Sequence, residues 1–171
     1  MIRLIEPEAA YLPSYIDAYD EYAAHHVTTF SFRNARVVDV LQQFDDAKHA
    51  RNLPPNRVAE TFYWLVDDDT RTYIGQISIR HQLTPALLRY GGHIGYGVRY
   101  SAWNRGLGTR MLALALEKAR EMGLSRVLIT CDEENIGSAR VMEKNGFTLS
   151  DRIENKIDGQ TVLTRRYWKT L

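Results

Sequence analysis

The spacing of apolar side chains divides the chain into helical and extended segments. Within residues 8–24, Leu12, Tyr15, Ile16 and Tyr19 recur at the three- and four-residue intervals of a helix. The remaining segments are marked either by the same spacing or by runs of β-branched and aromatic residues. The predicted helices are 8–24, 37–49, 108–122 and 135–145. The predicted strands are 2–5, 61–67, 72–81, 90–99, 126–131, 147–153 and 161–168.

The order of these segments predicts an α/β fold of the mixed α+β kind. Helices alternate with strands only in the second half, so a mixed sheet is expected rather than a purely parallel one. Polar turns at 67–71 and at Asp158-Gly159 predict two β-hairpins. No internal repeat, low-complexity tract or Gly/Ser-rich linker divides the chain. We therefore expect residues 1–171 to form one domain.

The most informative segment is the turn at 105–110, between a predicted strand and a long amphipathic helix. Gly106 and Gly108 allow the backbone to bend sharply and a ligand to approach it closely. The first amides of a helix have no partner within the helix, so such a turn suits an anion such as pyrophosphate. A single Gly-x-Gly is weak evidence, and taken alone it favours a plain tight turn. Neither a Gly-Lys-Ser/Thr sequence nor a third glycine follows, which excludes a nucleotide P-loop and a dinucleotide fingerprint.

Two motifs in this region resemble those of the GNAT acetyltransferases. The segment from Arg105 to Arg110 is similar to the family's acetyl-CoA pyrophosphate loop, Gln/Arg-x-x-Gly-x-Gly/Ala. Arg105 and Gly108 match that pattern, whereas Arg110 departs from it at the usually small last position. Residues 135–147 resemble the family's later cofactor motif, with its asparagine, its helix and its closing Gly-Phe. One helix and one strand separate the motifs, as in the family, and the resemblance is firm from 61 to 147.

The resemblance implies a twisted, mostly antiparallel mixed sheet whose central strands splay apart and are flanked by helices. It implies acetyl-CoA as cosubstrate, with its pantetheine arm in the cleft between the splayed strands and no metal. The residues that the family pattern assigns to cofactor binding are Val98, Arg99, Arg105, Gly106, Leu107, Gly108, Thr109, Arg110 and Asn135. The implied activity is N-acetyl transfer to a primary amine of a small molecule or peptide, by direct attack in a ternary complex.

Two catalytic positions differ from the family's usual residues. His93 stands where members often have a glutamate, and a histidine of pKa ~6.5 is a candidate general base. The alternative is a strand-end histidine held by a backbone hydrogen bond. Met142 stands where the family frequently has a proton-donating tyrosine. A thiol of pKa ~8.5 leaves acceptably without an acid, and Tyr96 or Tyr100 is a candidate substitute donor.

The composition limits the kinds of partner that the chain is expected to bind. Twenty-two Lys and Arg face twenty-one Asp and Glu, so no global charge attracts nucleic acid or an anionic membrane. The single cysteine, Cys131, lies in an apolar segment and is expected in the core, and the histidines show no metal-ligand spacing. The N-terminus lacks a signal peptide's apolar run, and the chain is expected in the cytoplasm as a monomer or homodimer.

Two other functions stay open at the level of sequence. The first is a catalytically degenerate acetyl-CoA-binding sensor module, which the methionine at 142 and the absent acidic base favour. The second is a partner-binding α/β domain without a cofactor, which requires both motifs to be accidental. Release of CoA in the presence of an amine separates the enzyme from the sensor. Stabilisation by CoA separates both of these from the cofactor-free domain.

Overall fold

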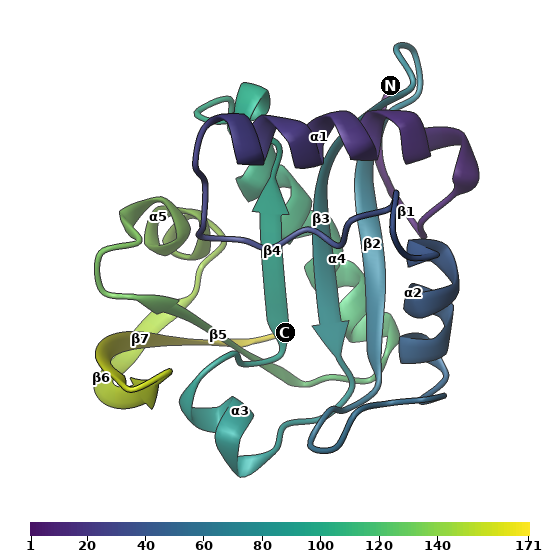
Figure 1. Cartoon of the computed structure of the whole chain (residues 1–171). Coiled ribbons are helices and arrows are strands. Elements are labelled where there is room, and N and C mark those ends of the chain that lie inside the picture. The colour runs from purple at the N-terminus through teal and green to yellow at the C-terminus, as the bar shows by residue number, and fades with distance from the viewer.

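Seven strands form two antiparallel sheets in this computed structural model, which describes all 171 residues (Figure 1). The first sheet has the order β1-β2-β3-β4 and the second the order β5-β7-β6. The first sheet contains β1 Ile2–Ile5, β2 Glu60–Asp67, β3 Thr72–Arg80 and β4 Ile94–Val98. The second contains β5 Arg126–Asp132, β6 Thr148–Ile157 and β7 Gln160–Thr170. The helices are α1 Leu12–Ala24, α2 Val40–Lys48, α3 Pro85–Arg89, α4 Leu107–Glu121 and α5 Ile136–Lys144.

The predicted mixed architecture is confirmed, with one local error. The strand predicted over 90–99 begins only at Ile94, and the short helix α3 before it was not expected. Gly91 and Gly92 have φ angles of 108° and 61°, which form a turn where an extended strand was predicted. Both predicted hairpins are present, and β6 and β7 extend further than predicted. None of the helices combines the length and the apolar character that a membrane crossing requires.

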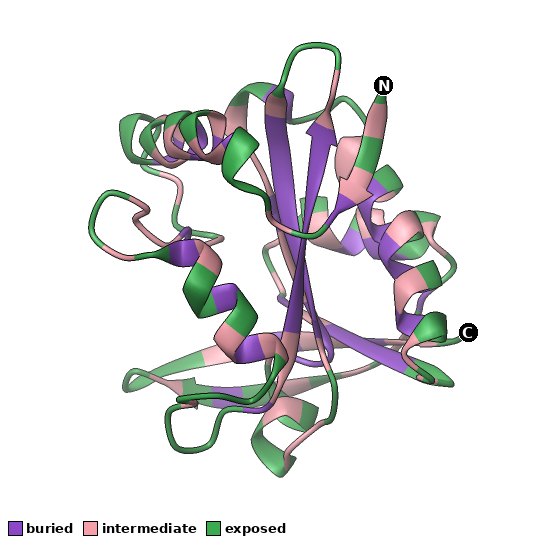
Figure 2. Ribbon diagram, turned by 90° about the vertical axis from the view of Figure 1, so that its right-hand side faces the viewer, coloured by how far each residue is buried: buried purple, intermediate pink, exposed green.

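The first sheet separates two apolar cores, because successive side chains of a strand face opposite sides (Figure 2). On β2, Tyr63 and Leu65 belong to the core that includes α4. Phe62 and Trp64 belong to the core beneath α1 and α2. Tyr15 of α1 is fully buried there and stacks on Trp64 with ring centroids 5.0 Å apart. The helical spacing of tyrosines in this segment therefore reflects core packing.

The two sheets touch where β4 and β5 begin. The backbone N–H of His93 donates to the Leu128 carbonyl at 2.7 Å, and the N–H of Leu128 donates to Nδ1 of His93 at 3.0 Å. The Gly91 N–H donates to Oγ1 of Thr130. Beyond this contact β4 pairs only with β3, so β4 and β5 diverge toward their C-terminal ends. The result is a V-shaped opening whose apex is the His93–Leu128 contact.

We predict that Gly92→Ala destabilises the fold by about 2–4 kcal/mol. The left-handed φ costs an alanine about 1–2 kcal/mol. In addition, a Cβ at this position would overlap the carbonyl oxygen of Leu128 at the apex. Gly159→Ala is the control, because Gly159 has φ of 80° but no atom within 4 Å of the added carbon. Urea unfolding of both variants measures the difference, and equal losses would show that crowding at the apex is unimportant.

Candidate functional site

The turn that precedes α4 presents a row of free backbone amides. Asn104 and Gly106 have positive φ angles of 58° and 73°, which turn the chain into the helix. The first amide of α4 with a backbone acceptor is that of Arg110, which donates to the Gly106 carbonyl. The N–H groups without an acceptor in the protein are those of Arg105, Gly106, Leu107, Gly108 and Thr109. Such a row of amides at a helix start is an anion-binding site.

The outer edge of β4 lies beside this turn. Arg99 donates its N–H to Ile74 of β3, and the His93 carbonyl accepts from Arg80, so the odd-numbered residues of β4 bond to β3. By the alternation of an antiparallel ladder, the backbone groups of Tyr96 and Val98 are directed away from β3, toward the V-shaped opening. An extended ligand therefore has an unpaired strand edge to bond to.

Two aromatic side chains that sequence reasoning missed bind this edge. The Tyr22 hydroxyl and the Trp103 Nε1 each donate to the Val98 carbonyl at 2.7 Å. Burial raises the pKa of Tyr22 to about 12, so its hydroxyl stays protonated and donates. Tyr22 lies 76 residues from Val98 along the chain, and no local pattern indicates this contact.

Arg99 anchors α1 to the rim of the opening. Its guanidinium donates to the Glu21 carboxylate, to Oγ of Ser14 at 3.1 Å and to the Tyr73 carbonyl at 3.0 Å. Glu21 also accepts from the backbone and hydroxyl of Ser101. Burial alone would raise the pKa of Glu21, but these hydrogen bonds outweigh it and hold the pKa below its ordinary value. The backbone of Arg99 is engaged as well, since its N–H donates to Ile74 and its carbonyl accepts from Ala102.

The opposite wall of the opening is the start of α5. Asn135 caps this helix, its Oδ1 accepting from the Ser138 N–H at 3.0 Å, while its Nδ2 has no partner in the protein. Tyr96 reaches across from β4, and its hydroxyl lies 2.8 Å from Oγ of Ser138. Burial raises the pKa of Tyr96 far above its ordinary value. Met142, which stands where the family frequently has a tyrosine, is fully buried in the core. It therefore contributes no hydroxyl to this wall.

His93 lies at the apex, and its ring is already hydrogen-bonded. Because Nδ1 accepts from the Leu128 N–H, the neutral ring carries its proton on Nε2 and has no free lone pair. Burial, and secondarily the nearby Arg80, lower the pKa of His93 to about 4. The general-base role stays a prediction, and in this arrangement it requires the Leu128 bond to open.

The remaining candidate residues belong to the framework. Cys131 is buried in the core, as expected, and burial raises the pKa of its thiol to about 11. His81 bonds to Oγ1 of Thr61, and the ring of His25 stacks on Tyr100. The structure contains no group of three or more His, Cys, Asp or Glu side chains that could hold a metal ion.

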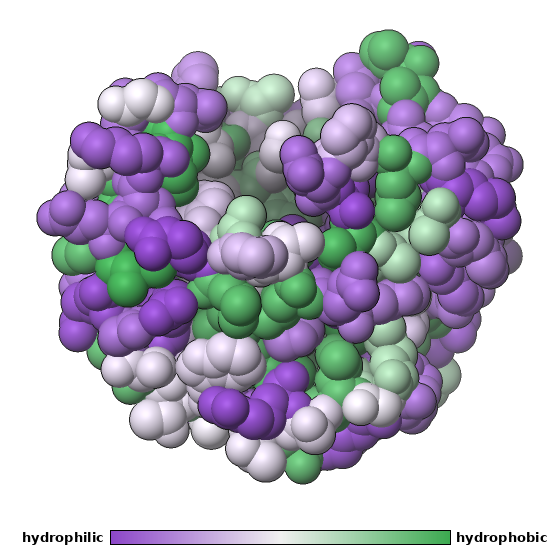
Figure 3. All heavy atoms as spheres, turned by 90° about the horizontal axis from the view of Figure 1, so that it is seen from below, coloured by the Kyte–Doolittle hydropathy of each residue, from purple (hydrophilic) through white to green (hydrophobic).

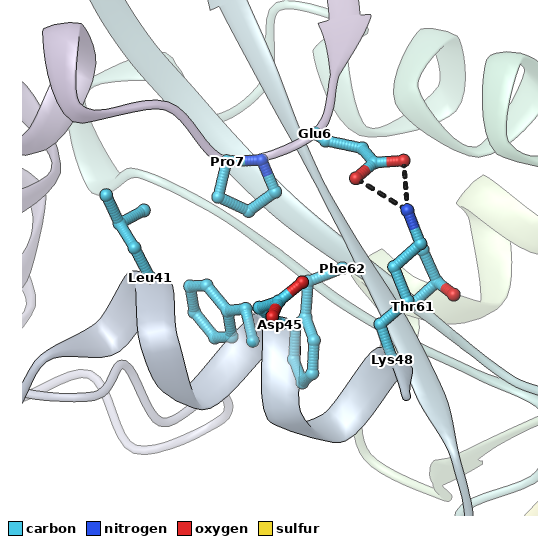
Figure 4. Close-up of a pocket in the computed structure, with 8 residues that line it drawn as sticks. Glu6, Pro7, Leu41, Asp45, Lys48, Thr61 and Phe62 are labelled. Carbon is cyan, nitrogen blue, oxygen red and sulfur yellow. Dashed lines mark hydrogen bonds and ion pairs between the residues drawn. The ribbon is translucent and has the colours of Figure 1, made fainter. Parts of the chain in front are cut away.

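A separate hollow of about 110 Å³ lies between α2 and β2 (Figure 4). Lys48 spans its rim, where Nζ bonds both carboxylate oxygens of Glu6 at 2.7 and 2.8 Å. Its lining residues are Glu6, Pro7, Leu41, Phe44, Asp45, Lys48, Thr61 and Phe62. None of them belongs to the turn at 105–110, to β4 or to α5, so this hollow is distinct from the V-shaped opening.

Comparison with known proteins places this geometry in context. The family model described as an acetyltransferase (GNAT) domain matches residues 3–148. The structure of the microcin self-immunity acetyltransferase MccE with acetyl-CoA and AMP is 16% identical, with 99% of this chain and 92% of that one covered and a TM-score of 0.74. RimL, a ribosomal-protein alpha-N-acetyltransferase solved with coenzyme A, is 16% identical over 99% and 94% of the two chains, with a TM-score of 0.73.

A third structure is that of yncA from Salmonella typhimurium, a putative acetyltransferase by its description, with acetyl-CoA. It is 13% identical over 99% of this chain and 93% of that one, with a TM-score of 0.67. At these identities the similarity concerns the fold. No curated protein sequence matches the chain significantly.

We predict that His93 makes stability fall as the pH is lowered from 6.5 to 4. The unfolded histidine titrates near ~6.5 and the folded one near 4, so between these values the unfolded chain binds more protons. The free energy of unfolding therefore decreases with falling pH, by up to about 3 kcal/mol at pH 4. His93→Asn keeps an acceptor close to the Nδ1 position and removes the titration. Urea unfolding against pH should be flatter for this variant by that amount.

The same variant also tests the general-base hypothesis. A general base predicts a turnover about a hundredfold lower in His93→Asn at neutral pH, with unchanged affinity for acetyl-CoA. If His93 is purely structural, the turnover of His93→Asn should stay within tenfold of wild type. Only the pH dependence of its stability should then change.

Proposed function

The chain belongs to the GNAT acetyltransferase family, and we propose that it transfers the acetyl group of acetyl-CoA to a primary amine of a small molecule or peptide. The transfer is a direct attack in a ternary complex. The observation that carries the proposal is the row of free amides from Arg105 to Thr109 beside the unpaired edge of β4. RimL, by its description, acetylates a protein α-amino group, and this supports an amine as the acceptor.

In this proposal the amides bind the pyrophosphate, and the strand edge binds the pantetheine arm. Tyr96 supplies a backbone donor and a backbone acceptor to the arm. Val98 supplies only its N–H, because its carbonyl already accepts from the side chains of Tyr22 and Trp103. The free Nδ2 of Asn135 faces the arm from α5. A backbone N–H of the β4 edge near Val98 is the proposed donor to the acetyl oxygen, where negative charge develops during attack.

The reaction also requires proton removal from the amine. An alkylammonium of pKa ~10.4 is neutral in fewer than about one molecule in a thousand at pH 7. His93 is the proposed acceptor of that proton, after its bond to Leu128 opens. The departing thiolate has a parent pKa of ~8.5 and leaves without an acid. The hydroxyl pair of Tyr96 and Ser138 is the donor that the opening offers in place of a tyrosine at 142.

The remaining features of the proposal come from the sequence. Residues 1–171 are proposed to be one acetyltransferase domain that acts as a monomer or homodimer in the cytoplasm. Nucleic acid and membrane are not proposed as partners, because the formal net charge is only +1.

We predict that the wild-type chain releases CoA from acetyl-CoA when primary amines are present. The measurement is thiol release against a panel of alkylamines, amino acids and short peptides with free N-termini. A rise in melting temperature with acetyl-CoA but no thiol release with any amine would identify a sensor module instead. Failure of acetyl-CoA to raise the melting temperature would identify a domain without this cofactor.

We further predict that Gly108→Val weakens the binding of acetyl-CoA at least tenfold, or about 1.4 kcal/mol. A Cβ at this position would lie 3.4 Å from Cγ2 of Val141 and 3.7 Å from Cγ2 of Val98, so a valine crowds both walls beside the free amides. Ala113→Val is the control, because it introduces the same side chain at an exposed position of α4. Calorimetric titration measures both affinities. An unchanged affinity in folded Gly108→Val would place the cofactor elsewhere.

A further inference from the structure

Gly95 is a glycine that the protein's own packing does not explain. At Gly97 a Cβ would overlap the ring of Phe30, and at Gly75 it would lie 2.7 Å from the Gly97 carbonyl oxygen. At Gly95 the nearest side-chain atom, Oγ of Ser78, would be 3.7 Å away, an ordinary contact. Its φ angle is not in the left-handed region. Because glycine weakens a strand, its presence here marks a place where another group approaches the backbone.

Gly95 lies on the face of the sheet that α1 and α2 cover only in part. Gly95 pairs with Ser78 on β3, and Ser78 pairs with Phe62 on β2, so the three share one face. In Figure 1 the segment from α1 to α2 crosses this face near its middle, and no helix covers the part below it. Figure 3, viewed from below, shows the surface hollowed at its upper edge, the side that faces the viewer in Figure 1. Gly95 itself is partly exposed.

A carboxylate lies on the same face of the sheet, beside Ser78, with one oxygen free. Oε1 of Glu60 accepts from the Ser78 hydroxyl at 2.6 Å and lies 3.6 Å from Nε of Arg80. Oε2 has no partner in the protein, although only 13% of the side chain is exposed. A partly desolvated carboxylate oxygen of this kind binds an ammonium group strongly, because few waters compete for it.

The same face carries a cation without a counterion. The Arg33 guanidinium lies 4.9 Å from the ring centroid of Phe44 and 5.1 Å from that of Phe62. Its one side-chain hydrogen bond goes to the neutral Gln43, and no carboxylate lies within 4.0 Å. Burial lowers the pKa of Arg33, and Glu60 is the largest opposing influence, so the two charges sense each other. The rings fix the guanidinium in place for an anion.

We propose that the acceptor is a primary amine that also carries an anionic group, and that it approaches the thioester over Gly95. Glu60 binds its ammonium group and Arg33 binds its anion. In the transfer the C–N bond forms as the C–S bond breaks, and sulfur leaves with the electron pair. Of the two protons that the ammonium loses, His93 accepts one and passes it to solvent, and sulfur takes the other. This assignment rests on the proposed function.

The first test separates the approach of the acceptor from folding. Gly95→Ala adds a methyl group that meets only ordinary contacts. The melting temperature of this variant should therefore equal or exceed that of wild type, and its affinity for acetyl-CoA should be unchanged within error. The same methyl group lies in the path of the acceptor, and kcat/KM for the amine should fall at least tenfold. Glu60→Gln should lower kcat/KM at least tenfold, chiefly through KM. Glu117→Gln, on an exposed position of α4, is the matched control and should change nothing.

The second test addresses the anion. The probes are leucine and glycine, each paired with its C-terminal amide. Wild type should prefer each free acid at least tenfold, Arg33→Gln should lose that preference, and Arg33→Lys should retain part of it. Equal use of acids and amides, or turnover of simple alkylamines only, would overturn the anion assignment. Full activity in both Gly95→Ala and Glu60→Gln would overturn the acceptor site, whereas no turnover of any amine by wild type with acetyl-CoA bound would overturn the proposed function itself.

Discussion

The site depends on one crowded contact, where the backbone of Gly92 and His93 crosses that of Leu128. The two strands are joined there by reciprocal bonds between His93 and Leu128. Arg80 holds the turn by donating to the carbonyls of Gly91 and Gly92 at 3.0 and 2.9 Å. A side chain on Gly92 would overlap the Leu128 carbonyl, so the sheets meet this closely only with glycine. Fixed at one end alone, β4 and β5 must separate at the other, and the separation leaves backbone groups of β4 unpaired.

This geometry gives the two faces of β4 different tasks. The even-numbered side chains, including Tyr96 and Val98, pack toward α4 and α5 and form the floor of the cofactor opening. The odd-numbered positions Gly95 and Gly97 face the side of α1 and α2. Phe30 fills the space over Gly97, while a Cβ on Gly95 would meet only ordinary contacts. A cofactor that lies along the outer edge of β4 can thus be approached past that edge, from the face on which Gly95 lies.

The sequence predicted the features whose causes are local. The turn at 105–110 was accessible because glycine permits a positive φ and a helix start always has unpaired amides. The sequence did not predict the contacts of Tyr22 with Val98, of Arg99 with Glu21 or of His93 with Leu128, which join residues 76, 78 and 35 positions apart. The strand predicted at 90–99 was placed to begin four residues too early, because Tyr90 is typical of β structure. In the structure, Gly91 and Gly92 form the turn at the apex instead.

Gly92, which precedes β4, and Gly95 and Gly97 within it show what the sequence cannot predict. Gly92, Gly95 and Gly97 are indistinguishable in the sequence, and alternation predicts only that the last two share a face. The structure gives each a different setting: a backbone crossing at Gly92, an aromatic ring at Gly97, and only ordinary side-chain contacts at Gly95. A glycine retained without an internal cause costs strand stability, since an alanine would fit there with ordinary contacts. That cost is offset only by something outside the chain, and the carboxylate of Glu60 across the same face indicates its charge.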